Sequence, residues 1–110
     1  KVSQKAEGNT LPLTISMFDQ DAVFFEHTNS HYVSLVNAIT GKGVSVYYPD
    51  FESLAIWTPI GGKASFLCLE PWNGSAIFHQ DDDVFAHKHS ILTLEPGKEK
   101  TYHLEISLIE

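Results

Sequence analysis

Arginine is missing from this sequence of 110 residues, and its seven basic residues are all lysines. Fourteen acidic residues outnumber them, so the formal net charge is −7. Proteins that grip phosphate backbones by counterion release need clustered Lys and Arg. We therefore expect neither nucleic acid nor an anionic membrane as a partner.

Cysteine is nearly missing too. The single thiol, Cys68, excludes an internal disulfide and favours a reducing, cytoplasmic compartment. No apolar run approaches the roughly 20 residues of a membrane span, and no signal-peptide pattern is visible. The sequence starts at Lys1 instead of Met and ends within a strand-like run, which fits a processed chain, a tag-cleaved chain or an excerpt of a longer protein. Its 43% apolar and 19% charged residues are ordinary for one small globular domain.

Short segments rich in β-forming residues, separated by turns, predict strands, and no segment carries a sustained helical stripe. Residues 1–10 are expected to be loop, and 71–89 a long connection. The alternation is cleanest near the end, where Tyr102, Leu104, Ile106 and Leu108 share one face. We predict an all-β, antiparallel β-sandwich formed by residues 1–110, with strands at 21–26, 31–39, 43–48, 53–57, 64–70, 90–94 and 101–109.

Three aspartates and three histidines gather in residues 79–89. Carboxylates suit Ca²⁺, Mg²⁺ or Mn²⁺, and His87 and His89 could reach a common Zn²⁺. The spacing lacks the Gly and the distal Glu of an EF-hand, and solvated Asp and His are typical of such a connection. We therefore expect no metal and no cofactor.

Glu70 continues an otherwise apolar face. Side chains alternate between the two faces of a strand, so Glu70 shares a face with Phe66 and Cys68. A buried carboxylate must be partnered, neutral or at the mouth of a cleft. One interpretation is a general base held on a rigid strand end, since partial desolvation makes a carboxylate a better base. The other is a strand-end Glu that reaches water, with Pro71 ending the strand. The residues alone favour neither.

The two tryptophans lie at neighbouring strand ends, Trp57 before Thr58-Pro59 and Trp72 after Pro71. Each is either a core residue or a flat wall against which a sugar packs. Cys68 has no positive neighbour that would activate its thiol, so we interpret it as a small core residue.

Three runs together resemble one family. They are SLAIWTPIGGKASFLCLEPWNG (53–74), LEPGKEKTYHLEISL (94–108) and LPLTISMFDQDAVFFE (11–26). They resemble the C-terminal portion of the aldose 1-epimerase (galactose mutarotase-like) family, in its bacterial epimerase-like branch. The resemblance implies that the sandwich is part of a larger galactose mutarotase-like supersandwich. It also implies an isomerase that interconverts the α and β anomers of an aldose such as galactose or glucose.

The resemblance implies a role for several residues. Glu70 matches the general base, Asp21 matches a carboxylate that binds sugar hydroxyls, and Trp57 or Trp72 would form a sugar-facing wall. The family's general-acid histidines and its sugar-binding arginine come from N-terminal segments that nothing in this sequence matches. We therefore expect an N-terminal remainder or a second chain to complete the sandwich, and negligible activity from this chain alone.

Two other functions fit the same residues. The chain could be a non-catalytic carbohydrate-binding β-sandwich module that keeps the scaffold without the chemistry. It could also be a structural or interaction domain, because an incomplete sandwich leaves sheet edges and apolar faces uncovered.

Overall fold

The computed structural model describes residues 9–110, so most of the loop predicted at 1–10 lies outside the described residues. The described part contains no α-helix, and none of its helices is long and apolar enough to cross a membrane. Its elements in chain order are η1 (Ile15–Phe18), β1 (Val23–Phe25), β2 (Tyr32–Val36), β3 (Gly43–Tyr47), β4 (Ser53–Trp57), η2 (Ile60–Gly62), β5 (Cys68–Trp72), η3 (Phe85–His87) and β6 (Glu105–Ile109), where η denotes a 3₁₀-helix.

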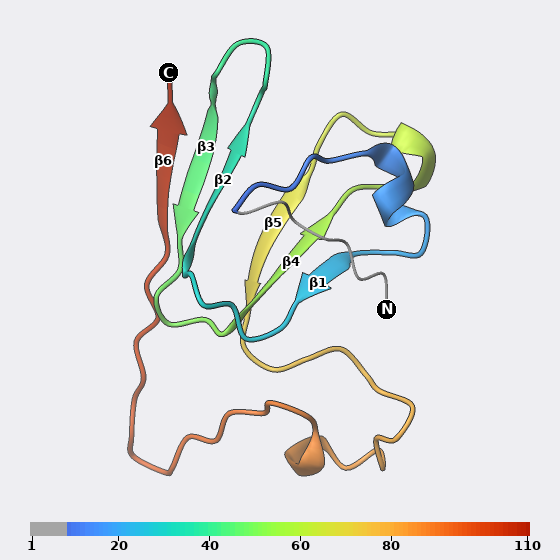
Figure 1. Cartoon of the computed structure of the whole chain (residues 1–110). Helices are drawn as coiled ribbons and strands as arrows, with labels where there is room; N and C mark the ends of the chain where they lie inside the picture. Colours follow the sequence, from blue (N-terminus) through green and yellow to red (C-terminus); the bar gives the residue numbers. More distant parts are fainter. Residues whose placement is uncertain (1–8) are drawn as a thin grey trace.

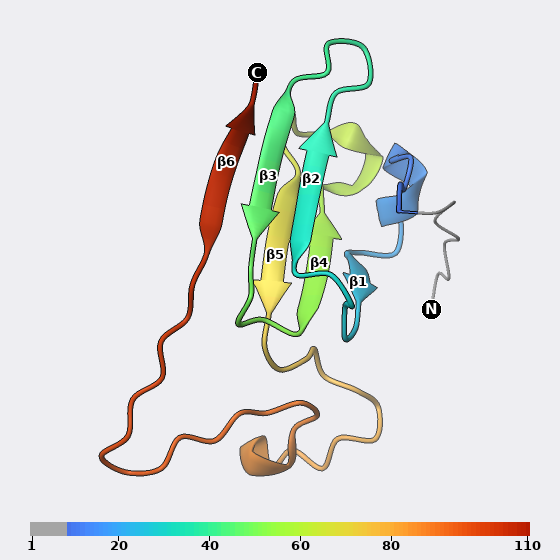
Figure 2. The ribbon, with the colours of Figure 1, turned by 60° about the vertical axis from the view of Figure 1, so that its left-hand side comes forward.

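The six strands form two three-stranded antiparallel sheets, which confirms the predicted all-β sandwich. One sheet has the order β1-β4-β5 and the other β2-β3-β6. Figure 1 shows both sheets, and Figure 2 shows β2 and β3 lying over β4 and β5. The chain passes between the sheets at the short connections β1–β2 and β3–β4, and again through the long connection 73–104.

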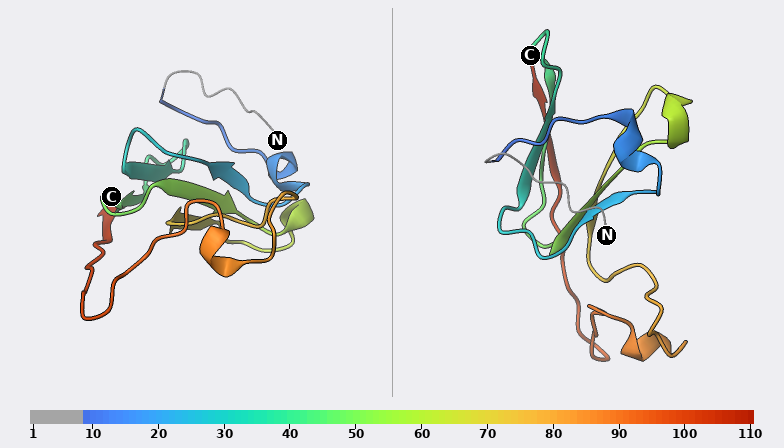
Figure 3. Two further views of the ribbon diagram at one scale, coloured as in Figure 1. Left: turned by 90° about the horizontal axis from the view of Figure 1, so that it is seen from below. Right: turned by 45° about the vertical axis from the view of Figure 1, so that its right-hand side comes forward.

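The core lies between the sheets and at one open end of the sandwich. Val46 of β3 packs in one cluster with Leu54 and Ile56 of β4. The right panel of Figure 3 shows the sheets meeting near the β3–β4 turn and diverging toward η1. Phe18 of η1 and Tyr48 are each 1% exposed and belong to this cluster. The segment 11–18 therefore supplies core side chains to the open end.

The strand expected at 64–70 is wrong in its limits. β5 begins at Cys68 and continues through Pro71 to Trp72. Pro71 was expected to stop the strand because it cannot donate to a ladder. It is tolerated because β5 is the edge strand of its sheet, with β4 on one side only. Cys68 is half-buried on the face turned away from the core, so its assignment as a core residue is also wrong.

The strand expected at 90–94 is absent from the structure. Those residues belong to the long connection, which runs outside the two sheets in Figure 1, and Leu92 and Leu94 are exposed. An apolar segment becomes a strand only where a partner strand can accept its backbone hydrogen bonds, and no strand lies beside this one.

The last strand is shorter and more exposed than its pattern predicts. β6 begins at Glu105 instead of residue 101 and pairs with β3 alone. The register places Ile106 opposite Val46 and Leu108 opposite Val44, which confirms that these two residues share a face, whereas Tyr102 and Leu104 precede the strand. That face is nevertheless uncovered, with Ile106 63% and Leu108 80% exposed, because β6 projects past the edge of the other sheet (Figure 2).

Candidate functional site

Glu70 lies on the outer face of the β1-β4-β5 sheet, away from the core. Leu69, the residue before Glu70, packs against the core cluster, to which Leu54 and Ile56 of β4 belong. Alternation then turns Glu70 and its partner across the strands, Ala55, to the opposite face. The carboxylate is half-buried. The predicted face is therefore confirmed, although it is not the face that forms the core.

Trp72 is hydrogen-bonded to Glu70. The indole Nε1–H donates to Oε2 of Glu70 over 3.2 Å, which is possible because residues two apart in a strand share a face. The indole also meets the ring of Phe24 edge to face, with centroids 5.4 Å apart and planes at 69°. Within residues 9–110, Trp72 is the one side chain that donates a hydrogen bond to Glu70.

Trp57 and Asp21 come together at a separate part of the same sheet. Both line a shallow hollow of ≈ 550 Å³, together with Asp19 and Lys63. Trp57 lies opposite Cys68 in the β4–β5 register, so its ring is on the outer face next to the row that contains Glu70. The structure thus brings Asp21 together with Trp57 at the hollow, and Glu70 together with Trp72 on the outer face of the sheet that carries Trp57. Glu70 and Trp72 do not line the hollow.

Asp21 is held in an uncommon backbone conformation just before β1. Its φ is 93°, in the left-handed half of the map that side chains other than Gly rarely adopt. Its Oδ1 accepts the backbone N–H of Ala22 over 2.8 Å, and its own N–H donates to the carbonyl of Phe18. The Oδ2 oxygen carries no hydrogen bond within the described part of the chain, and Asp21 lines the hollow.

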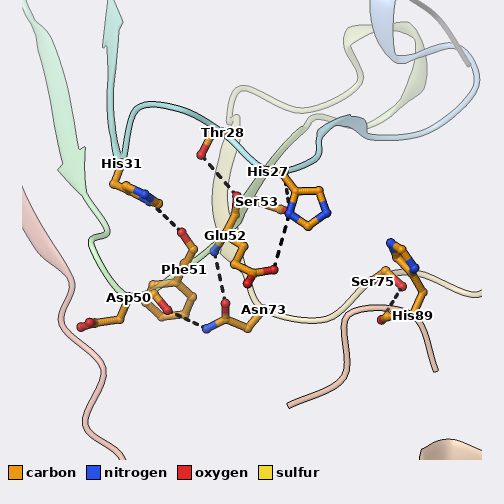
Figure 4. Close-up of polar contacts among 10 residues, drawn as sticks. All are labelled: His27, Thr28, His31, Asp50, Phe51, Glu52, Ser53, Asn73, Ser75 and His89. Carbon is orange, nitrogen blue, oxygen red and sulfur yellow. Dashed lines mark hydrogen bonds and ion pairs between the residues drawn. The ribbon is translucent and has the colours of Figure 1, made fainter. Parts of the chain in front are cut away.

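Hydrogen bonds from Asn73 fix the chain just beyond Trp72. Its Nδ2 donates to the carbonyl of Asp50 over 2.8 Å, and its Oδ1 accepts the N–H of Glu52 over 3.2 Å (Figure 4). The Glu-Pro-Trp strand end is therefore anchored to the β3–β4 turn. The sequence interpretation did not identify Asn73, because the partners lie more than twenty residues away and no local pattern announces them.

Four of the six histidines make polar side-chain contacts at the corner between the sheets or within the long connection. His31 Nδ1 donates to the carbonyl of Phe51, and His27 lies 3.6 Å from a carboxylate oxygen of Glu52 (Figure 4). The other two pairs, His103 with Asp50 and His87 with Asp82, each have an Nδ1···Oδ2 distance of 2.7 Å.

In both pairs the histidine lowers the pKa of the aspartate. Hydrogen bonds from the ring and then the backbone N–H of His103 hold the pKa of Asp50 below its usual range. The ring of His87, followed by the backbone N–H of Val84, does the same to the pKa of Asp82. Residues 9–110 contain no group of three or more His, Cys, Asp or Glu side chains arranged to hold a metal ion.

Two curated proteins are similar to the chain. They are the chromosomal and the plasmid forms of Protein LacX from Lactococcus lactis subsp. lactis. Each is 29% identical over 99 residues, which cover 88% of this chain and 33% of the relative. The chain thus spans about a third of the length of these relatives. No family model matches the chain, and no solved structure matches it.

Proposed function

We propose that the chain is the C-terminal portion of an aldose 1-epimerase-like protein in which Glu70 is the general base. The observation that carries the proposal is the half-buried carboxylate of Glu70, bonded by Trp72 on the sheet face that also presents Trp57. The family resemblance of the Glu-Pro-Trp strand end supports it. So does the similarity to relatives of which the chain spans about a third.

The proposed chemistry moves one proton at each end of a breaking bond. Glu70 takes the proton of the sugar's C1 hydroxyl, the bond between C1 and the ring oxygen breaks, and a general acid protonates the ring oxygen. The open-chain aldehyde then turns and recloses on its other face, which returns both protons. Asp21 would accept hydrogen bonds from sugar hydroxyls, and the ring of Trp57 would pack against the sugar's C–H face. The acid comes from segments outside this chain.

Polarimetry of freshly dissolved α-galactose or α-glucose tests this proposal. A general acid contributes a rate factor of about 10²–10⁴, so the 110-residue chain alone should leave the spontaneous rate almost unchanged. The polypeptide encoded by the complete reading frame should accelerate it. Strong acceleration by the chain alone, lost in Glu70→Gln, would mean that the acid lies within these residues after all.

A carbohydrate-binding module without catalysis is the second candidate. The observation in its favour is that Asp21 and Trp57 line a hollow to which Glu70 does not contribute. Under this alternative, Trp57→Ala abolishes sugar binding in a calorimetric or NMR titration, whereas Glu70→Gln leaves it intact. Loss of binding in Glu70→Gln as well would favour the epimerase site.

A further inference from the structure

We propose that Trp72 is a positioning residue for Glu70: its indole N–H fixes the carboxylate so that one oxygen stays free to take a proton. The inference deepens the proposed function and rests on it. It also changes the role of Trp72, for which the family resemblance implies, as an alternative to Trp57, a place in a sugar-facing wall. In the structure the polar atom of the indole is already bonded to Glu70.

A glutamate side chain needs such a partner because its last torsion is broad and nearly two-fold. Without a donor, the carboxylate plane of Glu70 would rotate and present either oxygen to a ligand. The 3.2 Å bond from Nε1 of Trp72 engages Oε2, and no hydrogen bond reaches Oε1 from residues 9–110. A hydrogen bond to an ionised carboxylate is also stronger than one between neutral groups, so it holds this orientation.

The indole ring also packs against a second aromatic ring. Phe24 of β1 contacts the indole edge to face, at 5.4 Å between centroids. Between the strands that carry these two rings lies β4, where Ala55 is opposite both Phe24 and Glu70 in the register. The small side chain of Ala55, 1% exposed, leaves the room in which Phe24 reaches Trp72 across the middle strand.

The backbone on both sides of Trp72 is constrained as well. Pro71 has its φ fixed by its ring, so the geometry between Glu70 and Trp72 has little freedom. Asn73 is tied to the β3–β4 turn by its two side-chain hydrogen bonds. Glu-Pro-Trp-Asn is thus a rigid unit in which the second residue sets the spacing, the third orients the carboxylate, and the fourth anchors the strand end.

NMR of the 110-residue chain tests the hydrogen bond without any sugar. The chain has two indole N–H signals, which Trp57→Phe and Trp72→Phe assign. Glu70→Gln should shift the Trp72 signal and speed its exchange with solvent, and leave the Trp57 signal in place. Glu105→Gln, on a strand of the other sheet, should move neither. An unshifted Trp57 signal also shows that the Glu70 variant is folded.

Kinetics of the polypeptide from the complete reading frame test the consequence. Trp72→Phe keeps an aromatic ring against Phe24 but removes the N–H, so kcat should fall roughly tenfold while KM stays within about twofold. A residue of the sugar wall would instead raise KM. A raised KM in Trp72→Phe would overturn the positioning role, and so would a Trp72 indole signal that does not shift in Glu70→Gln. Neither result would contradict the assignment of Glu70 as the base. Full activity of Glu70→Gln overturns the proposed function itself.

Discussion

One oxygen of Asp50 accepts two hydrogen bonds from a single residue, His103. The backbone N–H and the ring Nδ1 of His103 both lie 2.7 Å from Oδ2 of Asp50. The two residues are 53 positions apart, and the contact joins the β3–β4 turn to the chain just before β6. The return of the long connection to the sandwich is thus fixed at an ionisable pair.

The contact between Asp50 and His103 should make the free energy of unfolding depend on pH. Because His103 lowers the pKa of Asp50 from 3.8, the unfolded chain binds this proton at a higher pH than the folded chain. The contribution to the free energy of unfolding is therefore complete above about pH 3.8 and is lost as the pH falls through the lower folded value. In urea titrations, Asp50→Asn should be less stable than wild type at pH 6, and the difference should shrink below pH 3.8. Asp83→Asn is the control, since the Asp83 side chain forms no hydrogen bond or ion pair in the part of the chain that the structure describes. A difference for Asp50→Asn that stays constant down to pH 2 would contradict the assignment.

Adding one methyl group at Gly43 should strongly lower the free energy of unfolding. A Cβ at this position would collide with the backbone carbonyl oxygen of Leu35 on β2, so Gly43→Ala must distort the β2–β3 hairpin. Gly41, two residues earlier, is the matched control. It has φ +72° and no atom near its would-be Cβ, so Gly41→Ala should cost only the left-handed strain of about 1 kcal/mol. If chemical denaturation shows that both variants lose the same free energy of unfolding, Gly43 does not lie close to the carbonyl oxygen of Leu35.

Phe18 tests whether η1 is part of the core. Its ring is 1% exposed at the open end of the sandwich, so Phe18→Ala should lower the free energy of unfolding by about 3–5 kcal/mol. Ile39→Ala, at a residue that is 95% exposed in the β2–β3 turn, should change it by less than about 0.5 kcal/mol. If Phe18→Ala hardly changes the free energy of unfolding, η1 is not part of the core.

The uncovered side of β6 predicts association. Ile106 and Leu108 are exposed on an edge strand, an arrangement that invites pairing with another chain. Analytical ultracentrifugation of the 110-residue chain should detect concentration-dependent association, which Ile106→Lys weakens. Ser107→Lys is the matched control, because Ser107 lies on the opposite face of the same strand. A chain that is monomeric at every concentration would count against an incomplete sandwich.

The sequence predicts those strands whose side chains alternate and whose partners are near in the chain. The faces of β2 and β3 follow from Val33, Leu35, Val44 and Val46, because a two-residue period and a glycine-containing turn determine both register and orientation. β4 matches its predicted limits, since five apolar or small residues in a row favour a buried central strand.

The failures concern features that depend on distant neighbours. Residues 90–94 have strand-forming side chains but no partner strand, and Pro71 is allowed in β5 because that strand is at an edge. The same limit applies to the site. Period-two counting finds the shared face of Cys68 and Glu70, but it cannot show that Trp72 donates to Glu70 or that Phe24 reaches over Ala55.

The central claim is that Glu70 is the proton acceptor of an aldose epimerase. Its most direct test is the anomeric equilibration of α-galactose, followed by polarimetry with the polypeptide of the complete reading frame, its Glu70→Gln variant and its Glu105→Gln control. We expect acceleration by the wild type and the control, and a loss of about 10²–10⁴-fold in Glu70→Gln. Acceleration that is unchanged in Glu70→Gln would contradict it.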